Sequence, residues 1–127
     1  MPNERILIVE DNPMNLKLVR DTLQVKGYQT VEAGTGEEGV RLAREVRPDL
    51  ILMDIQLPGI NGIEALALLR DDPTTRSVPV IAVTASLMTH DRTRIMAAGF
   101  DGFQGKPISV RELLETIRQV LERADET

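Results

Sequence analysis

Residues 50–54 read Leu-Ile-Leu-Met-Asp, four apolar residues that end in an aspartate. A run this short and this apolar is typical of a strand buried on both faces of a parallel sheet. Residues 6–9 and 80–83 have the same character. Residues 29–33 are more polar, which suits the edge of a sheet, and residues 100–104 form the weakest candidate. The sequence therefore predicts five strands.

The segments between these strands carry helix start and stop signals. Four positions have the residue type of a helix N-cap: Asn12, Thr35, Asn61 and Ser109. The last three are each followed by a glutamate three residues later, as in a capping box. The stop signals are Gly27, Pro48, the Asp72-Pro73 pair and Gly99. A fourth helix is expected at about residues 89–98. The last helix is expected to place one apolar face on the core: Val110, Leu113, Leu114, Ile117 and Leu121.

Five alternating strand–helix units predict the fold class, an α/β domain with a doubly wound parallel sheet. Right-handed crossovers place helices on both faces of such a sheet. The length of 127 residues matches one domain, so we expect a single domain over residues 1–127. Ligands of such sheets bind at the carboxyl ends of the strands, which is where the polar residues matter most.

Composition excludes several classes of function. The net charge of −5 and the presence of only three aromatic residues argue against a nucleic-acid partner. The absence of cysteine excludes disulfides, thiolate catalysis and cysteine-ligated zinc. The first apolar stretch spans only residues 6–9, too short for a signal peptide or a membrane span. We therefore expect a cytoplasmic protein with no nucleic-acid or membrane partner.

Acidic residues end two of the expected strands. Glu10 and Asp11 follow the first strand and precede the cap Asn12, and Asp54 ends the third strand. One alternative is that the acid pair only complements the dipole of the following helix. If the two strands are neighbours, however, three carboxylates converge. They then raise one another's pKa unless a cation lies among them.

A cluster of oxygen ligands without histidine or cysteine suits Mg²⁺, with Mn²⁺ as a substitute. We expect Asp11 and Asp54 to be direct ligands and Glu10 to bind through water. The backbone carbonyl of Gln56 is expected to be a third protein ligand.

The fourth and fifth strands end in Thr84-Ala85 and Lys106-Pro107. If a phosphoryl group binds beside these strand ends, the Thr84 hydroxyl could donate a hydrogen bond to one of its oxygens, and the small Ala85 would leave room for it. The alternative for Thr84 is simply a strand-forming residue. Lys106, otherwise a solvated lysine, is expected to be a counter-charge to the acids. Pro107 is expected to fix the loop, through a cis bond if one forms.

The acid pair, aspartate, threonine and Lys-Pro at these strand ends resemble the response-regulator receiver domains, the CheY-like family of two-component and phosphorelay signalling. Residues 6–12 (Ile-Leu-Ile-Val-Glu-Asp-Asn) and 53–59 (Met-Asp-Ile-Gln-Leu-Pro-Gly) carry the resemblance, which covers the whole chain. The first helix and residues 106–110 (Lys-Pro-Ile-Ser-Val) are most similar to DivK-type single-domain regulators. The resemblance implies a flavodoxin-like strand order of 2-1-3-4-5 and no effector domain.

The resemblance also implies a function. Asp54 would accept a phosphoryl group from a histidine kinase or a histidine phosphotransfer protein, with Lys106 and Thr84 supporting the transfer. The chain would then catalyse only its own phosphorylation and dephosphorylation. Thr84 and Phe103 would switch the face made by helix four, strand five and helix five, where an unidentified target protein would bind. A homodimer is a further expected partner, with no face assigned to it. Gln56 and Ser86 would tune the lifetime of the phosphoryl group.

Other interpretations stay open at this stage. The chain could be a receiver piece of a hybrid histidine kinase, because similar motifs occur there. It could also be a Mg²⁺-dependent phosphatase with an aspartyl nucleophile, although Gln56 stands where such enzymes place a second carboxylate. A binding module that has lost the chemistry is disfavoured because every required residue type is present. A flavin-binding protein is disfavoured because no phosphate loop rich in glycine, serine or threonine follows the first strand.

Overall fold

The computed structural model describes residues 3–85 and 89–125, with residues 89–91 and 125 described by their backbone alone. In this part of the chain five strands alternate with five helices. The strands are β1 (Arg5–Val9), β2 (Gln29–Ala33), β3 (Leu50–Asp54), β4 (Val80–Thr84) and β5 (Gly102–Gly105). The helices are α1 (Pro13–Val25), α2 (Gly36–Val46), α3 (Gly62–Arg70), α4 (Thr89–Ala97) and α5 (Val110–Asp125). Within the described ranges, no helix combines the length and the hydropathy needed to cross a membrane.

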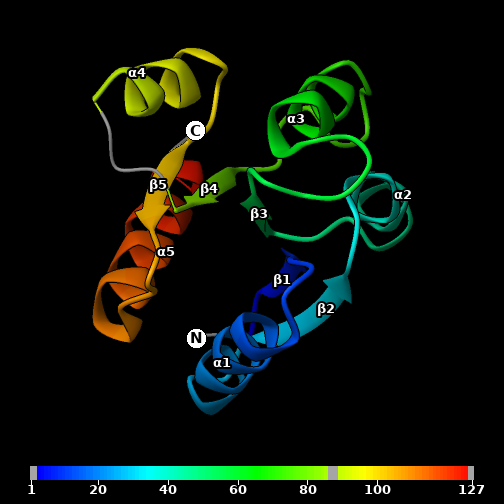
Figure 1. Ribbon diagram of the computed structural model, residues 1–127. Helices are drawn as coiled ribbons and strands as arrows, with labels where there is room; N and C mark the ends of the chain where they lie inside the picture. The colour runs from blue at the N-terminus through cyan, green and yellow to red at the C-terminus, as the bar shows by residue number, and fades with distance from the viewer. Residues whose placement is uncertain (1–2, 86–88, 126–127) are drawn as a thin grey trace.

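The strands form one parallel sheet in the order β2-β1-β3-β4-β5, which confirms the expected fold and strand order. Figure 1 shows the sheet between two helical layers, with α1 and α5 on one face and α2, α3 and α4 on the other. Strand ends lie side by side because Val9 pairs with Met53 and Asp54 with Val83. The residues that follow these strands are thereby brought to one edge of the sheet.

Alternating strand residues enter two separate cores. In β3, Ile51 and Met53 belong to the core shared with α2, α3 and α4. Leu50 and Leu52 belong to the core shared with α1 and α5. Both cores are mainly aliphatic, as expected for strands that are buried on both faces.

The boundaries of the last strand were predicted wrongly. The strand begins at Gly102, whereas residues 100–104 were expected, and it ends at Gly105. Gly99 turns the chain with φ +107°, and Phe100 packs into the core before the strand begins. The side chain of Asp101 accepts a hydrogen bond from Val80 N at 2.8 Å, so the regular ladder starts one residue later. Tertiary contacts therefore decide this boundary.

The helix caps follow the expected residues with one difference. Asn12 accepts from Met14 N at 2.9 Å, and Asn61 forms a complete capping box with Glu64. Thr35 accepts from Glu38 N, but the Glu38 side chain returns its bond to Gly34 N and so misses the cap residue. The box at this helix is therefore shifted by one residue.

The expected apolar face of α5 is also corrected at one position. Leu113, Ile117 and Leu121 are buried, whereas Val110 is 38% exposed. The first turn of α5 therefore presents an apolar side chain to solvent.

Candidate functional site

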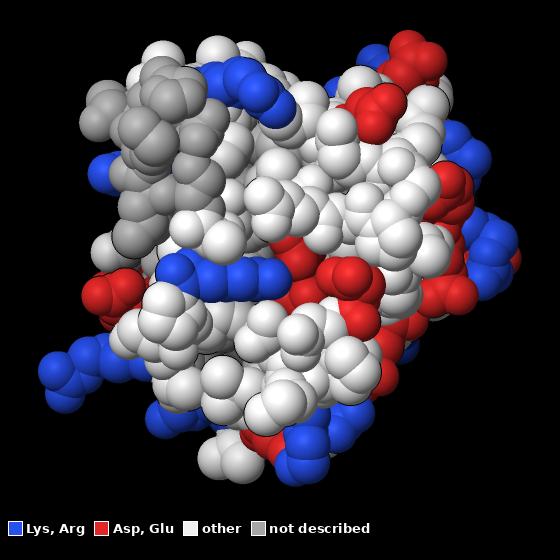
Figure 2. Space-filling model, viewed as in Figure 1, with Lys and Arg blue, Asp and Glu red and all other residues white. Residues whose placement is uncertain are grey.

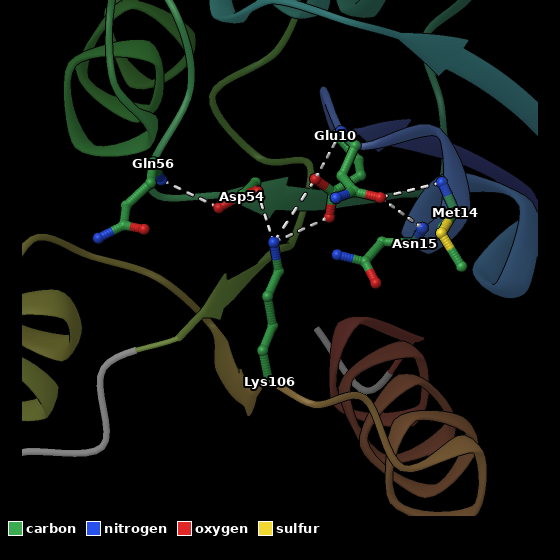
Figure 3. Close-up of polar contacts among 7 residues, drawn as sticks. Glu10, Met14, Asn15, Asp54, Gln56 and Lys106 are labelled. Atoms are coloured by element: carbon green, nitrogen blue, oxygen red, sulfur yellow. Dashed lines mark hydrogen bonds and ion pairs between the residues drawn. The ribbon is translucent and has the colours of Figure 1, made fainter.

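The carboxyl ends of four strands supply the candidate site. Asp54 and Thr84 are the last residues of β3 and β4, and Glu10 and Lys106 directly follow β1 and β5. Figure 3 shows Lys106 extending from the end of β5 toward Asp54 and Glu10. The structure thus brings these predicted residues of β1, β3 and β5 together at one edge of the sheet.

Lys106 forms two ion pairs with little access to water. Its Nζ lies 2.8 Å from Asp54 Oδ2 and 3.1 Å from Glu10 Oε1, and the two acidic side chains are only 4% and 5% exposed. Burial alone would lower the pKa of Lys106, but its bonds to Asp54 and Glu10 outweigh burial and raise that pKa. In Figure 2 a blue side chain crosses the middle of this face and ends against a red patch. Lys106 is therefore the expected counter-charge.

Glu10 is held between opposing influences. Asn12 N donates to Glu10 Oε2 at 3.1 Å, which fixes the carboxylate over the start of α1. Burial, followed by the neighbouring Asp54, raises the pKa of Glu10 to about 7. Lys106 and the Asn12 amide act in the opposite direction. A cation bound beside this buried carboxylate would favour its ionised form and so lower the pKa.

Three carboxylates converge as predicted. One oxygen from each of Glu10, Asp11 and Asp54 lies within 4.8 Å of the other two. Asp11 is exposed, so the cluster opens to solvent on its side. Gln56 N donates to Asp54 Oδ1 at 2.9 Å, which holds the Gln56 peptide close to the Asp54 carboxylate. An all-oxygen donor set of this kind fits Mg²⁺, which binds few carboxylates and keeps water ligands.

Gly62 supports Asp54 from behind, a contact that the sequence analysis did not identify. A Cβ atom at Gly62 would lie 2.5 Å from the Asp54 carbonyl oxygen and 2.9 Å from Ile55 Cα. Gly62 N also donates to Ile55 O at 2.9 Å. The first turn of α3 therefore packs directly on the backbone of Asp54. A glycine directly after the cap Asn61 is the signal that could have indicated this contact.

The ends of β4 and β5 are joined through their backbones. Lys106 N donates to Thr84 O at 2.8 Å, and Thr84 itself is buried. Ala85, which directly follows Thr84, is exposed. The Lys106–Pro107 peptide bond is cis.

Phe103 is half-buried and packs against the core shared with α4. The Arg92 guanidinium lies 5.2 Å from the centre of its ring, a cation–π contact between α4 and β5. Ser86, one of the two expected lifetime-tuning positions, lies outside the described residues.

α1 carries an apolar stripe that the sequence analysis missed. Met14 and Val25 are 81% and 84% exposed, and Leu18 between them is 41% exposed. Their spacing of four and seven residues places them on one side of the helix. Figure 3 shows Met14 at the first turn of α1, on the Glu10 side of the site. The helical spacing of Met14, Leu18 and Val25 in the sequence could have indicated this stripe.

Comparison with known proteins gives a consistent result. The family model of the response regulator receiver domain matches residues 6–118. The polar-differentiation response regulators DivK of Brucella anthropi and Brucella ovis are 50% and 49% identical to this chain over 116 residues. That alignment covers 91% of this chain and 94% of each relative.

Solved structures agree with the sequence relatives. A receiver domain of a sensor histidine kinase from Pseudomonas aeruginosa, with magnesium coordinated in its active-site cleft, superposes with a TM-score of 0.88 at 34% identity. The match covers 94% of this chain and 98% of that one. A CheY-like receiver domain protein from Methanospirillum hungatei superposes with a TM-score of 0.87 at 30% identity, over 98% of both chains.

Proposed function

Because this chain belongs to the response regulator receiver family of two-component signalling, we propose that Asp54 accepts a phosphoryl group from a phosphohistidine. One observation carries the proposal: the buried Asp54 carboxylate meets both Lys106 and the acids Glu10 and Asp11 at the open edge of the sheet. A structural ion pair needs one cation and one acid. Two further carboxylates beside such a pair would repel its acid, and a cation bound among them would offset this repulsion.

In the proposed transfer, an Asp54 carboxylate oxygen attacks the phosphorus of the donor. The bond between phosphorus and the histidine nitrogen breaks, and the imidazole leaves with the electron pair. The Asp54 oxygens are oriented before the reaction because Oδ1 accepts from Gln56 N and Oδ2 from Lys106 Nζ. Phosphoryl transfer through a loose transition state depends mainly on such alignment and on neutralised charge.

Mg²⁺ would be held by Asp11, Asp54 and the Gln56 carbonyl, with Glu10 acting through water. When bound, the ion would offset the negative charge that gathers on the phosphoryl oxygens. The donor set around Asp54 supports this assignment, as does the magnesium in the cleft of the Pseudomonas aeruginosa receiver. Mn²⁺ shares the preference for oxygen ligands and is included in the proposal.

Lys106 would move its ammonium group from the carboxylate to the new phosphoryl group, and the Thr84 hydroxyl would donate to one of the phosphoryl oxygens. Exposed Ala85 leaves space for the group, and Pro107 shapes the loop behind Lys106. Thr84 and Phe103 would then shift a pre-existing equilibrium between two conformations of the α4–β5–α5 face. A groove of about 620 Å³ on this face, lined by Phe103, Lys106 and Arg111 among others, supports it as the docking site of a target protein.

A protein donor, either a histidine kinase or a histidine phosphotransfer protein, fits the surface beside the site. The exposed Met14 and Leu18 give the rim of the acid cluster an apolar contact area, which a small phosphate ester would not use. We propose that the chain works as a single-domain regulator in the cytoplasm, like its DivK relatives, and that its only catalysis is its own phosphorylation and dephosphorylation. The 50% identity to one of those relatives over 116 residues supports this proposal.

Acetyl phosphate with Mg²⁺ tests the proposal without requiring the natural donor. Intact-mass spectrometry should show one added phosphoryl group on the wild-type protein and none on Asp54→Asn. Asp71→Asn is the matched control, because Asp71 is an exposed aspartate at the end of α3, and it should label like the wild type. Equal labelling of Asp54→Asn would refute the assignment. Catalytic turnover of a panel of phosphate esters would instead favour the phosphatase interpretation.

A further inference from the structure

The loop between β3 and α3, residues 55–61, begins at the candidate site and ends at the cap of α3. At its start, Gln56 N donates to Asp54 Oδ1 at 2.9 Å. At its end, Asn61 forms the capping box of α3. Figure 1 shows this loop, drawn in green, passing beside α2 before it enters α3. Within the described part of the chain, the main chain of residues 57–60 makes one hydrogen bond, and its partner is a side chain of α2.

Two consecutive residues in the first turn of α2 contact the second half of this loop. Glu37 Oε2 accepts a hydrogen bond from Ile60 N at 3.3 Å. The same carboxylate covers Gly59, because a Cβ atom at Gly59 would lie 2.6 Å from Oε2 and 2.7 Å from Oε1. Gly36 lies against the loop as well, since a Cβ atom there would lie 2.8 Å from Ile60 O. The Glu37 carboxylate therefore occupies the space that a side chain at position 59 would take.

The start of α2 does not require this placement of Glu37. Thr35 caps the helix by accepting from Glu38 N, and Glu38 bonds to Gly34 N. Glu37 and Glu38 both lie in the first turn, where an acid complements the helix dipole. Among the described residues, however, the hydrogen bond of the Glu37 side chain joins a segment 23 residues further along the chain. Glu37 thus links α2 to the loop beside the candidate site.

We propose that Glu37 is a positioning residue for Mg²⁺ binding, which it supports by holding the loop that carries Gln56. This role rests on the proposed function, in which the Gln56 carbonyl is a ligand of the ion. Asp54 holds the amide nitrogen of Gln56, whereas the Gln56 carbonyl leads into residues 57–60. The orientation of that carbonyl therefore depends on what holds residues 57–60, and Glu37 provides their hydrogen bond.

Few free backbone angles separate the contact at Ile60 from Gln56. The side chain of Leu57 is buried in the core, and the ring of Pro58 fixes the φ angle of that residue. Gly59, which has the most conformational freedom, is the residue that the Glu37 carboxylate covers. A loop that is ordered in the metal-free protein loses less conformational entropy when the ion binds. Loss of the Glu37 contact should therefore weaken Mg²⁺ binding.

Glu37→Ala and Glu37→Gln separate the hydrogen bond from the charge. Both variants lose the negative charge, but glutamine keeps an oxygen that can accept from Ile60 N. Isothermal titration calorimetry with Mg²⁺ should give Glu37→Ala a dissociation constant about threefold higher than the wild type. That factor lies in the lower part of the range for one net hydrogen bond, because Glu37 is exposed and water can replace it. Glu37→Gln should bind Mg²⁺ like the wild type. At saturating Mg²⁺, Glu37→Ala should be phosphorylated by acetyl phosphate at the wild-type rate.

Amide hydrogen exchange of Ile60, followed by NMR in the metal-free protein, gives a second measurement. Exchange should be faster in Glu37→Ala and unchanged in Glu37→Gln. Glu45→Ala is the matched control, because Glu45 is an exposed acid of the same helix that pairs with Arg41 at 3.1 Å. It should change neither the exchange of Ile60 nor the affinity for Mg²⁺.

Gly59→Ala tests where the Glu37 carboxylate lies. In the wild type the added Cβ would displace this carboxylate, whereas in the Glu37→Ala background only the strain at φ +76° remains. Gly59→Ala should therefore raise the dissociation constant for Mg²⁺ by a larger factor in the wild type than in the Glu37→Ala background. Equal factors in the two backgrounds would overturn the proposed placement.

The calorimetry distinguishes failure of this role from failure of the proposed function. If the wild type binds Mg²⁺ and Glu37→Ala binds it equally well, the positioning role alone is wrong. Equal weakening in Glu37→Ala and Glu37→Gln would also overturn the positioning role, because the charge would then be responsible. A wild type that binds no Mg²⁺ would overturn the proposed metal site together with this role. Urea unfolding of each variant checks that the fold is kept.

Discussion

Replacing Gly62 with alanine should disturb the phospho-acceptor through its own backbone. The added Cβ would lie 2.5 Å from the Asp54 carbonyl oxygen and 2.9 Å from Ile55 Cα. Both contacts are with backbone, so no flexible side chain can yield. To reach ordinary contact at 3.4 Å, α3 and the end of β3 must separate by about 0.9 Å. The displaced atoms belong to Asp54 and to the turn that carries Gln56.

The size of the effect follows from two opposing contributions. Overpacking of a close contact costs about 1–3 kcal/mol, and rigid backbone neighbours favour the upper part of that range. Replacing glycine by alanine in a helix returns about 0.5–1 kcal/mol. We therefore expect Gly62→Ala to lower the free energy of unfolding by about 2 kcal/mol. A misplacement of about 1 Å also costs up to about 100-fold in the rate of phosphorylation.

Urea unfolding followed by far-ultraviolet circular dichroism measures the stability change, and phosphorylation by acetyl phosphate measures the rate. Gly34→Ala is the matched control, because a Cβ there would meet no atom within 4 Å. That variant should be neutral or more stable by about 0.4–1 kcal/mol through the unfolded chain. If Gly62→Ala matched Gly34→Ala in both stability and rate, the contact between α3 and Asp54 would not have the proposed importance.

Two further predictions concern the loops. Asn12→Ala removes the side chain that accepts hydrogen bonds from Met14 N and Asn15 N, and should lower the free energy of unfolding by about 1 kcal/mol. Urea unfolding measures this change, and an unchanged urea midpoint would contradict the prediction. The pKa of Asp72 is lowered by the Thr74 backbone amide, then by the Thr74 hydroxyl and by Arg44. A lowered folded-state pKa stabilises the protein above the unfolded-state pKa, and this stabilisation is lost as pH falls through the folded-state value. Asp72→Asn should thus unfold more easily than the wild type at neutral pH, with the difference in melting temperature vanishing in acid; a difference that persists in acid would argue against it.

The central strands could be predicted because their apolar runs are uninterrupted, and the polar residues Asp54 and Thr84 were expected at their ends. β3 and β4 each continue one residue further than the apolar run, through Asp54 and Thr84. Backbone pairing does not depend on side-chain polarity: Ile55 N still donates to Val83 O at 3.0 Å. The functional residues are therefore part of the sheet, which gives them rigid positions.

The convergence of the acids was predictable only on the condition that β1 and β3 are neighbours. Residue spacing does not determine which strands pair, and the strand order came from the family resemblance. The burial of Glu10 against Lys106 and the support of Asp54 by Gly62 depend on contacts between distant segments. The exposure of Val110 is a similar case, because helix periodicity alone does not tell which part of an apolar face a neighbour covers.

The sheet separates the buried side chains into two cores that pack separately from each other. Ile51 and Leu52 are adjacent in sequence, yet among the described residues their side chains belong to different cores. Changes in their size should therefore perturb the packing of different sets of neighbours. Leu52 and Leu113 are distant in sequence but share one core, so the tolerated size of one depends on the other. Substitutions in this chain are thus free to accumulate on one side of the sheet while the packing on the other side stays fixed.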